Sequence, residues 1–205
     1  MQELFVRTDK KLIPTLPRYT FNGRIVVVQS ESEANRAIDY LRKHSIVGID
    51  TETRPSFRRG VQYKVALIQI ATSEICFLFR LNYMGFPDSL ISFLEDEKIG
   101  KVGLSLKDDT HQLAQRYPRF KPKNFIDLQQ IAAQMGIEDM SLAKLFANFF
   151  RLRILKNAQL SNWEADALDE KQRIYAATDA SACLLLFSKM KELTGNKQYK
   201  LTSGI

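Results

Sequence analysis

An uncharged run that ends in two carboxylates constrains the fold of this chain more than any other stretch of its sequence. Residues 46–49 are apolar or glycine, and Asp50 and Glu52 follow them with one residue between. Short apolar runs of this kind are typical of buried strands. Side chains alternate along a strand, so both carboxylates are expected on the same side of it. Such a pair favours a divalent cation, Mg²⁺ or Mn²⁺, between the two charges, although an acidic turn after a core strand has the same pattern.

The size and composition of the chain are those of one globular domain. It has 205 residues, 45% of them hydrophobic, which is enough for a single core. Its apolar runs are far shorter than the roughly 18 residues of a membrane span, and its N-terminus lacks the features of a signal peptide. Cys76 and Cys183 lie far apart in apolar segments and are expected to be reduced core residues. These features predict an intracellular, cytoplasmic protein with no membrane partner.

The net charge of +7 favours polyanionic partners. Lysine and arginine neutralise phosphates and release counterions, so a basic excess suits nucleic acid above all. Many basic proteins bind nothing of the kind, and the charge alone therefore does not decide the function.

The order of patterns along the chain predicts an α/β domain. Residues 1–22 contain two prolines and are expected to form an extended arm, residues 23–193 the domain, and residues 194–205 a flexible tail. Strands are predicted at 25–28, 46–53, 65–70, 75–79 and 101–104. Helices are predicted at 30–43, 87–94, 105–113, 128–136, 141–150 and 169–193. Strands dominate the first half and helices the second, which predicts one mixed sheet covered by helices.

A third carboxylate stands out in the final long helix. Between Ile174 and Phe187 apolar residues occupy every face of the helix, and Asp179 is its one charge, the pattern of a buried helix. A buried carboxylate must be neutralised, paired with a cation or bound to a metal. Tyr175 lies one turn earlier on the same face. Pairing of Asp179 with a lysine or arginine is the alternative to a metal.

A fourth carboxylate, Asp109, lies near the start of the helix that follows the strand at 101–104. Ligand sites of open α/β sheets gather at strand ends, so Asp109 is a candidate to meet Asp50 and Glu52. Its neighbour Asp108 competes for this role, and acidic residues in a first helical turn also occur simply because they complement the helix dipole.

These acidic residues occur in the order of a known family. The segments that carry the likeness are Val47-Gly48-Ile49-Asp50-Thr51-Glu52, Val102 to Asp109, and Tyr175-Ala176-Ala177-Thr178-Asp179-Ala180. They resemble the three exonuclease motifs of the four-acid 3′-5′ exonucleases, in the tyrosine-bearing branch with ribonuclease D and the Werner-syndrome exonuclease domain. The register of the second motif favours Asp109 over Asp108. The likeness covers roughly residues 24–190. The chain ends soon after the third motif, so the accessory helical domain of ribonuclease D is not expected here.

The resemblance implies a fold, a reaction and a set of site residues. The fold is ribonuclease-H-like, with a mixed five- to six-stranded sheet and helices on both faces. The reaction is two-metal-ion hydrolysis of a phosphodiester at the 3′ end of DNA or RNA, releasing nucleoside 5′-monophosphates. Asp50 is expected to bridge two Mg²⁺ or Mn²⁺ ions, Glu52 and Asp179 to complete the first site, and Asp109 to support the second. Tyr175 is expected to orient the attacking water, since a phenol is a poor base at neutral pH.

A basic segment directly after the first motif supplies the candidates for substrate binding. Arg54, Phe57, Arg58 and Arg59 would contact a phosphate or stack on a base, and a solvated loop explains them equally well. Lys156, with Arg153, would hold the strand from another segment. Trp163 is more often a packing residue than a stacking platform.

Two other readings use the same residues. A catalytically silent nucleic-acid-binding module would keep the fold, but it has no need of four acids and a tyrosine. A ribonuclease-H-like endonuclease or integrase also places acids on such a sheet, and Tyr175 one turn before Asp179 favours the exonuclease. Phosphate-cradling glycine loops, zinc-ligand spacings and nucleophile elbows do not occur in the sequence.

Overall fold

A computed structural model describes residues 1–195 and 198–203. The strands of its main sheet are β2 (Arg24–Val28), β3 (Ile46–Thr53), β4 (Val65–Ala71), β5 (Ile75–Arg80), β6 (Gly100–Gly103) and β7 (Phe125–Asp127). The helices are α1 (Glu31–Leu41), α2 (Leu81–Met84), α3 (Asp88–Leu94), α4 (Leu106–Arg116), α5 (Leu128–Gln134), α6 (Leu142–Phe150) and α7 (Glu170–Gly195), with a short 3₁₀ helix at Ile13–Thr15.

The main sheet is mixed, and its strand order is β2-β5-β4-β3-β6-β7 within the described residues. The strands β3, β4 and β5 pair antiparallel, whereas β6 is parallel to β3, and β7 to β6. The pairing of β6 with β3 covers Ile46 to Gly48 only. The last residues of β3 therefore have β4 on one side and no strand on the other, and this leaves room beside Asp50 for other elements.

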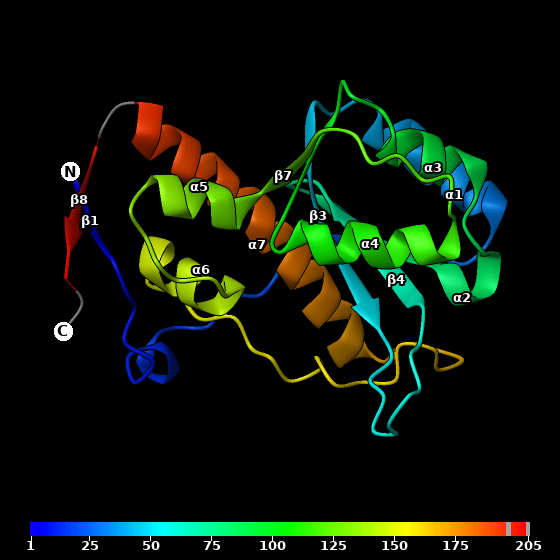
Figure 1. Cartoon of the computed structure of the whole chain (residues 1–205), viewed down its shortest axis with the longest axis horizontal. Helices are drawn as coiled ribbons and strands as arrows, with labels where there is room; N and C mark the ends of the chain where they lie inside the picture. The colour runs from blue at the N-terminus through cyan, green and yellow to red at the C-terminus, as the bar shows by residue number, and fades with distance from the viewer. Residues whose placement is uncertain (196–197, 204–205) are drawn as a thin grey trace.

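Helices cover both faces of this sheet, as Figure 1 shows. The long helix α7 crosses one face in contact with β3, β4, β5 and β6, and α5 and α6 pack against α7. The other face carries α1, α3 and α4, whose apolar residues share one core with β3 and β5. The capping box of α1, Ser30 with Glu33, forms as its spacing predicts. The predicted mixed α/β sheet of five to six strands with helices on both faces is thus confirmed.

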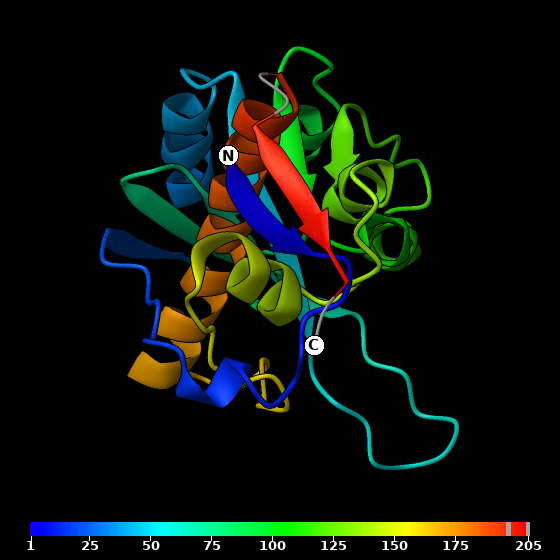
Figure 2. The same ribbon diagram turned by 90° about the vertical axis from the view of Figure 1, so that its left-hand side faces the viewer.

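Each end of the chain contains a short strand that the sequence analysis did not predict. Gln2–Phe5 (β1) and Tyr199–Thr202 (β8) form a separate parallel sheet of two strands, seen side by side in Figure 2. Leu4 is fully buried, and the Asn148 side chain bonds both the N–H and the carbonyl of Phe5. Helix α7 also runs two residues past its predicted end. Residues 196–197 and 204–205 of the predicted tail lie outside the described residues.

None of the helices that the structure describes is long and apolar enough to cross a membrane. Cys76 and Cys183 are buried and free, as predicted.

Candidate active site

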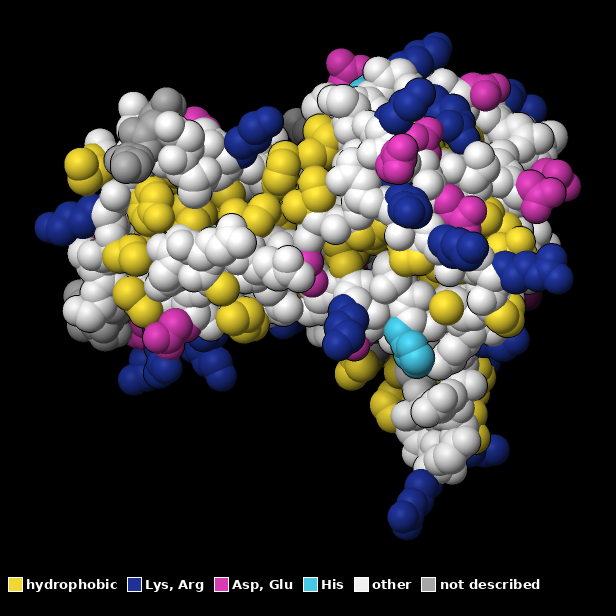
Figure 3. Space-filling view, turned by 45° about the horizontal axis from the view of Figure 1, so that its top comes forward, with side chains coloured by type: hydrophobic (Ala, Val, Ile, Leu, Met, Phe, Trp, Pro, Cys, Tyr) yellow, Lys and Arg dark blue, Asp and Glu magenta, His cyan; other side chains and the backbone are white. Residues whose placement is uncertain are grey.

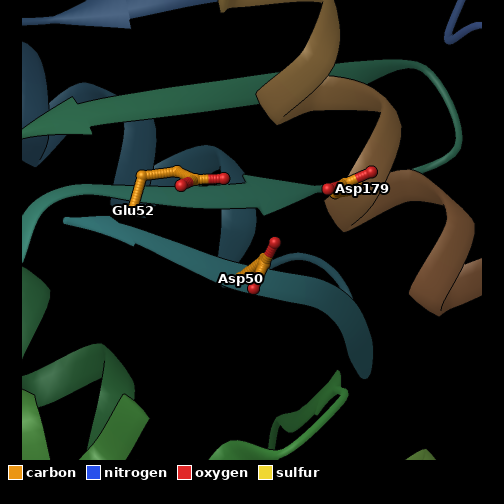
Figure 4. Close-up of side chains that lie close together, drawn as sticks. All are labelled: Asp50, Glu52 and Asp179. Carbon is orange, nitrogen blue, oxygen red and sulfur yellow. The ribbon is translucent and has the colours of Figure 1, made fainter. Parts of the chain in front are cut away.

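Three of the predicted acidic residues meet where α7 crosses β3. Asp50 and Glu52 lie on β3 and Asp179 on α7, and each offers an oxygen within 4.8 Å of the others. Figure 4 shows the side chains of the strand and of the helix gathered in one place. Strand alternation puts Asp50 and Glu52 on the face that α7 covers. The apolar surroundings that predicted a buried helix leave Asp179 only 7% exposed, and Glu52 is 8% exposed.

The close crossing of helix and strand depends on the glycine at position 48. A Cβ atom on Gly48 would lie 2.0 Å from the carbonyl oxygen of Ala180. The residue at position 48 therefore has to be glycine for α7 to lie at this distance from β3. Gly48 and Asp50 are two residues apart and lie on the same face of β3. The contact between Gly48 and Ala180 therefore sets the separation between Asp50 and Asp179.

The carboxylates of this cluster have few partners. Among the described residues, none of the three lies within salt-bridge distance of a lysine or arginine, so the alternative of an ion pair for Asp179 is not found. One oxygen of Asp179, Oδ1, is buried and accepts no hydrogen bond in the described part of the chain. Asp50 accepts one from the Gln69 amide at 3.3 Å. Buried oxygens without donors are groups that a cation would satisfy.

Burial and mutual repulsion raise the pKa values of the three carboxyl groups. Burial raises the pKa of Glu52 to about 10, with Asp50 and Asp179 adding repulsion. Burial also holds the pKa of Asp50 well above its usual range, and Asp109 and Asp179 raise it further. The pKa of Asp179 rises to about 7 through burial, while Tyr175 and Lys156 lower it. Three hard oxygen donors that repel one another when ionised fit a Mg²⁺ or Mn²⁺ ion.

Metal-free stability is expected to fall as the pH rises from about 5 to about 8. Unfolded carboxyl groups have pKa values of about 4, whereas folded Asp179 and Glu52 titrate at about 7 and about 10. The folded protein therefore binds more protons over this range, and the free energy of unfolding decreases with pH. Mg²⁺ or Mn²⁺ replaces these protons, so the rise in Tm on adding metal should grow over the same range.

Thermal unfolding in EDTA and in metal at both pH values measures the two trends. Equal metal-induced shifts at the two pH values would contradict a metal site built from these carboxyl groups.

Asp109 lies apart from the three clustered acids. It approaches from α4, on the far side of β3, and accepts a hydrogen bond from the Thr51 hydroxyl. Burial raises its pKa to about 6, Thr51 lowers it, and Asp108 and Asp127 raise it. Asp109 also adds to the raised pKa values of Asp50 and Glu52, so its charge is within electrostatic reach of the cluster. Asp108 is exposed.

Two residues that support the site were given no role from the sequence. Asp127 accepts hydrogen bonds from the backbone N–H groups of Ser105 and Leu106, at the start of α4, and caps α5 through Gln129. Asp127 thereby holds the first turn of α4, the helix that carries Asp109, in place. Gln69 donates to Asp50 from the neighbouring strand. The signal for Gln69 was present, because it is the one polar residue of β4.

Tyr175 faces the cluster from the turn of α7 that precedes Asp179. Burial raises the pKa of its phenol, and the charges of Asp179 and Glu52 raise it further, so the hydroxyl stays protonated at neutral pH. The ring packs against Trp163 with centroids 6.0 Å apart. Trp163 is fully buried, which confirms its predicted packing role.

Five of the six candidates for substrate binding fall into two places. Lys156 lines a cleft of about 330 Å³ together with Asp50, Glu52, Tyr175 and Asp179. The other four, Arg54, Phe57, Arg58 and Arg59, belong to the loop between β3 and β4, which projects from the body of the molecule in Figure 3.

The chain matches known proteins over most of its length. The family model for 3′-5′ exonuclease matches residues 25–194. A "3′-5′ exonuclease" of Arabidopsis thaliana is 34% identical over 193 residues, which cover 86% of this chain and 67% of that protein. The "Bifunctional 3′-5′ exonuclease/ATP-dependent helicase WRN" of Mus musculus is 32% identical; the match covers 89% of this chain and 14% of that protein.

Solved structures agree in fold. The Nibbler EXO domain of Aedes aegypti has a TM-score of 0.80 at 20% identity, covering 89% of this chain and 95% of that one. RNase D of Escherichia coli has a TM-score of 0.74 at 22% identity, covering 85% and 46%. The family match over residues 25–194 and the identity with the Arabidopsis protein show that this chain belongs to the family of 3′-5′ exonucleases, which are metal-dependent nucleases.

Proposed function

We propose that this chain is a two-metal-ion exonuclease that removes nucleotides from the 3′ end of DNA or RNA and releases nucleoside 5′-monophosphates. One observation carries the proposal: in a chain of this family, Asp50, Glu52 and Asp179 each offer an oxygen within 4.8 Å of the others in an open cleft. A silent binding module would gain nothing from three crowded carboxylates, because their repulsion destabilises the fold and repels phosphate.

Each carboxylate of the cluster has its own role in binding the metal ions. Asp50, central on β3, would be a ligand in both sites for Mg²⁺ or Mn²⁺, and Glu52 and Asp179 would be the further ligands of one site. Asp109, held by Thr51 beside the same strand, would serve the second. When bound, the ions stabilise the charge that develops on the attacking and leaving oxygens of an in-line displacement.

The remaining cleft residues orient water and substrate. The protonated hydroxyl of Tyr175 would fix the attacking water by a hydrogen bond, because its raised pKa prevents it from taking the proton at neutral pH. Lys156, the cation on the cleft wall, would contact a phosphate of the bound strand.

Replacing Tyr175 by Phe is expected to lower kcat by about 100-fold, the lower end of the range for a group that handles water in the transition state. KM and Tm should change little, since the ring keeps its contact with Trp163. The turnover of an end-labelled oligonucleotide and a thermal melt measure the three quantities. A kcat equal to that of the parent would remove Tyr175 from the reaction.

Incubation of end-labelled single strands of DNA and RNA with Mn²⁺ or Mg²⁺ tests the function itself. Shortening from the 3′ end, with nucleoside 5′-monophosphates as products, is the expected result. Binding of either strand without any shortening would instead establish the silent module.

A further inference from the structure

A second groove adjoins the acidic cleft. It lies between the β3–β4 loop and the segment around residue 160, has a volume of about 530 Å³, and is lined by Arg54, Phe57, Arg58, Val61, Leu160 and Asn162 among others. Gln159 lines the acidic cleft and Leu160 lines this groove. Glu52 lines the cleft and Arg54 the groove in the same way. The same two segments of the chain, residues 50–54 and 159–160, therefore line both depressions with neighbouring residues.

Large apolar side chains that are exposed to solvent line this groove. Seven large hydrophobic side chains are exposed in the described part of the chain, and three of them line this groove: Phe57 at 85%, Leu160 at 72% and Val61 at 40% exposure. Single exposed apolar residues are ordinary, whereas a group of them in one hollow indicates a contact surface.

The arginines of the loop have two different situations. Arg54 has partners within the protein. Its guanidinium lies 4.8 Å from the centre of the Tyr63 ring and 3.5 Å from a carboxylate oxygen of Glu164. The ion pair with Glu164 joins the base of the loop to the opposite side of the groove. Arg58 and Arg59 are exposed, and no carboxylate among the described residues lies within salt-bridge distance of either. Their charges are available to a ligand.

We infer that this groove binds the unpaired strand next to its 3′-terminal nucleotide, with a base stacked on Phe57 and a backbone phosphate on Arg58. The inference rests on the proposed function, which places the 3′ end of the strand at the carboxylate cluster. Aromatic faces beside free guanidinium groups suit a single strand, whose bases expose their π-faces and whose phosphates carry the charge. In a duplex these faces are stacked on one another and are closed to Phe57.

The position of the groove next to the acidic cleft favours a nucleic-acid strand over a protein partner as its ligand. A strand whose terminal nucleotide lies at Asp50 has to leave the acidic cleft, and the groove continues the cleft past Gln159 and Glu52. A peptide partner would have no reason to lie in line with the carboxylates. The inferred class of substrate is therefore a 3′ end with several unpaired nucleotides.

Two substrates separate the groove from the reaction centre. Thymidine 5′-(p-nitrophenyl) phosphate needs only the metal centre, whereas a single-stranded 12-mer of DNA or RNA also reaches the groove. In Phe57→Ala and in the double variant Arg58→Ala/Arg59→Ala we expect kcat/KM on the 12-mers to fall about tenfold, the scale of one lost stacked base, with hydrolysis of the ester unchanged. Phe57→Trp should keep the parent rate. Arg36→Ala, an exposed arginine on α1 outside the groove, is the control for charge.

Binding in Ca²⁺, followed by fluorescence anisotropy, keeps the test independent of turnover. The same variants should bind both 12-mers about tenfold more weakly, with no change for a blunt duplex. Parental binding and turnover of the 12-mers in the variants would overturn the inference, as would an equal loss on the duplex or on the ester. If the parent hydrolyses neither substrate, the proposed function fails, and the anisotropy still decides on the groove.

Discussion

Asp50→Asn is expected to reduce exonuclease turnover by at least about a thousand-fold, since loss of one group that stabilises transition-state charge already costs roughly 10²–10³. Burial raises the pKa of Asp50, and both Asp109 and Asp179 raise it further, so Asp50 lies within electrostatic reach of both. The amide keeps the shape of the side chain and still accepts the hydrogen bond from Gln69, but it carries no charge for a cation. Turnover of an end-labelled oligonucleotide in Mn²⁺ measures the loss.

The same substitution is expected to stabilise the metal-free protein. Burial, followed by the charges of Asp109 and Asp179, disfavours the ionised carboxylate of Asp50 in the folded protein, and the neutral amide of Asn avoids this cost. A gain of about 1–2 kcal/mol would raise Tm by roughly 2–8 °C in a chain of this size. The gain should be larger at about pH 8 in EDTA than at about pH 5, because the pKa of Asp50 is raised in the folded protein and the parent therefore loses stability as the pH rises. Opposite signs for activity and stability are typical of a site held together for function.

Asp108→Asn is the matched control for this pair of measurements. It removes an exposed carboxylate of α4 that does not belong to the cluster, so activity and Tm should both remain at the parental values. Retention of activity in Asp50→Asn would refute the proposed reaction. A Tm in EDTA that does not rise would show that the three carboxylates do not repel one another in the folded protein.

The parts of the fold that the sequence predicted are those with a strong local pattern. The run before Asp50 could only be a buried strand, and α7 is apolar on every face over several turns, so both were recognisable without knowledge of their neighbours. The hairpin of β4 and β5 was visible because its partners are adjacent in sequence. Pairing of β1 with β8 joins residues almost 200 positions apart. Four-residue strands carry too little pattern for such a contact to be predicted.

The site residues that the sequence predicted are likewise those with a local pattern. Asp179 was recognisable as the one charge in a buried helix, and Asp50 and Glu52 by their alternation. The roles of Asp127 and Gln69 depend on which backbone N–H groups and carboxylates lie opposite them in space, and no spacing in the sequence records that. The division of the arginines also needed the structure, because the partner of Arg54 is Glu164, more than 100 residues away.

Gly48→Ala is expected to be the most damaging substitution that adds only a methyl group. The new Cβ would lie 2.0 Å from the carbonyl oxygen of Ala180, and both atoms belong to backbone that cannot rotate away. Helix α7 must move off β3. Overpacking of this kind costs about 1–3 kcal/mol or more, so we expect Tm to fall by roughly 2–12 °C.

Activity should fall with stability, because the contact that Gly48 permits also sets the distance from Asp50 to Asp179. A displacement of about 1 Å in a reacting group can cost 10²-fold in rate, and the metal-induced rise in Tm should shrink as the oxygens separate. Gly195→Ala is the control, since a Cβ at that end of α7 meets open space. If Gly48→Ala kept the parental Tm and rate, the acids would not owe their convergence to the close crossing of strand and helix. If it lost stability alone, Asp179 would hold its place by contacts other than this one.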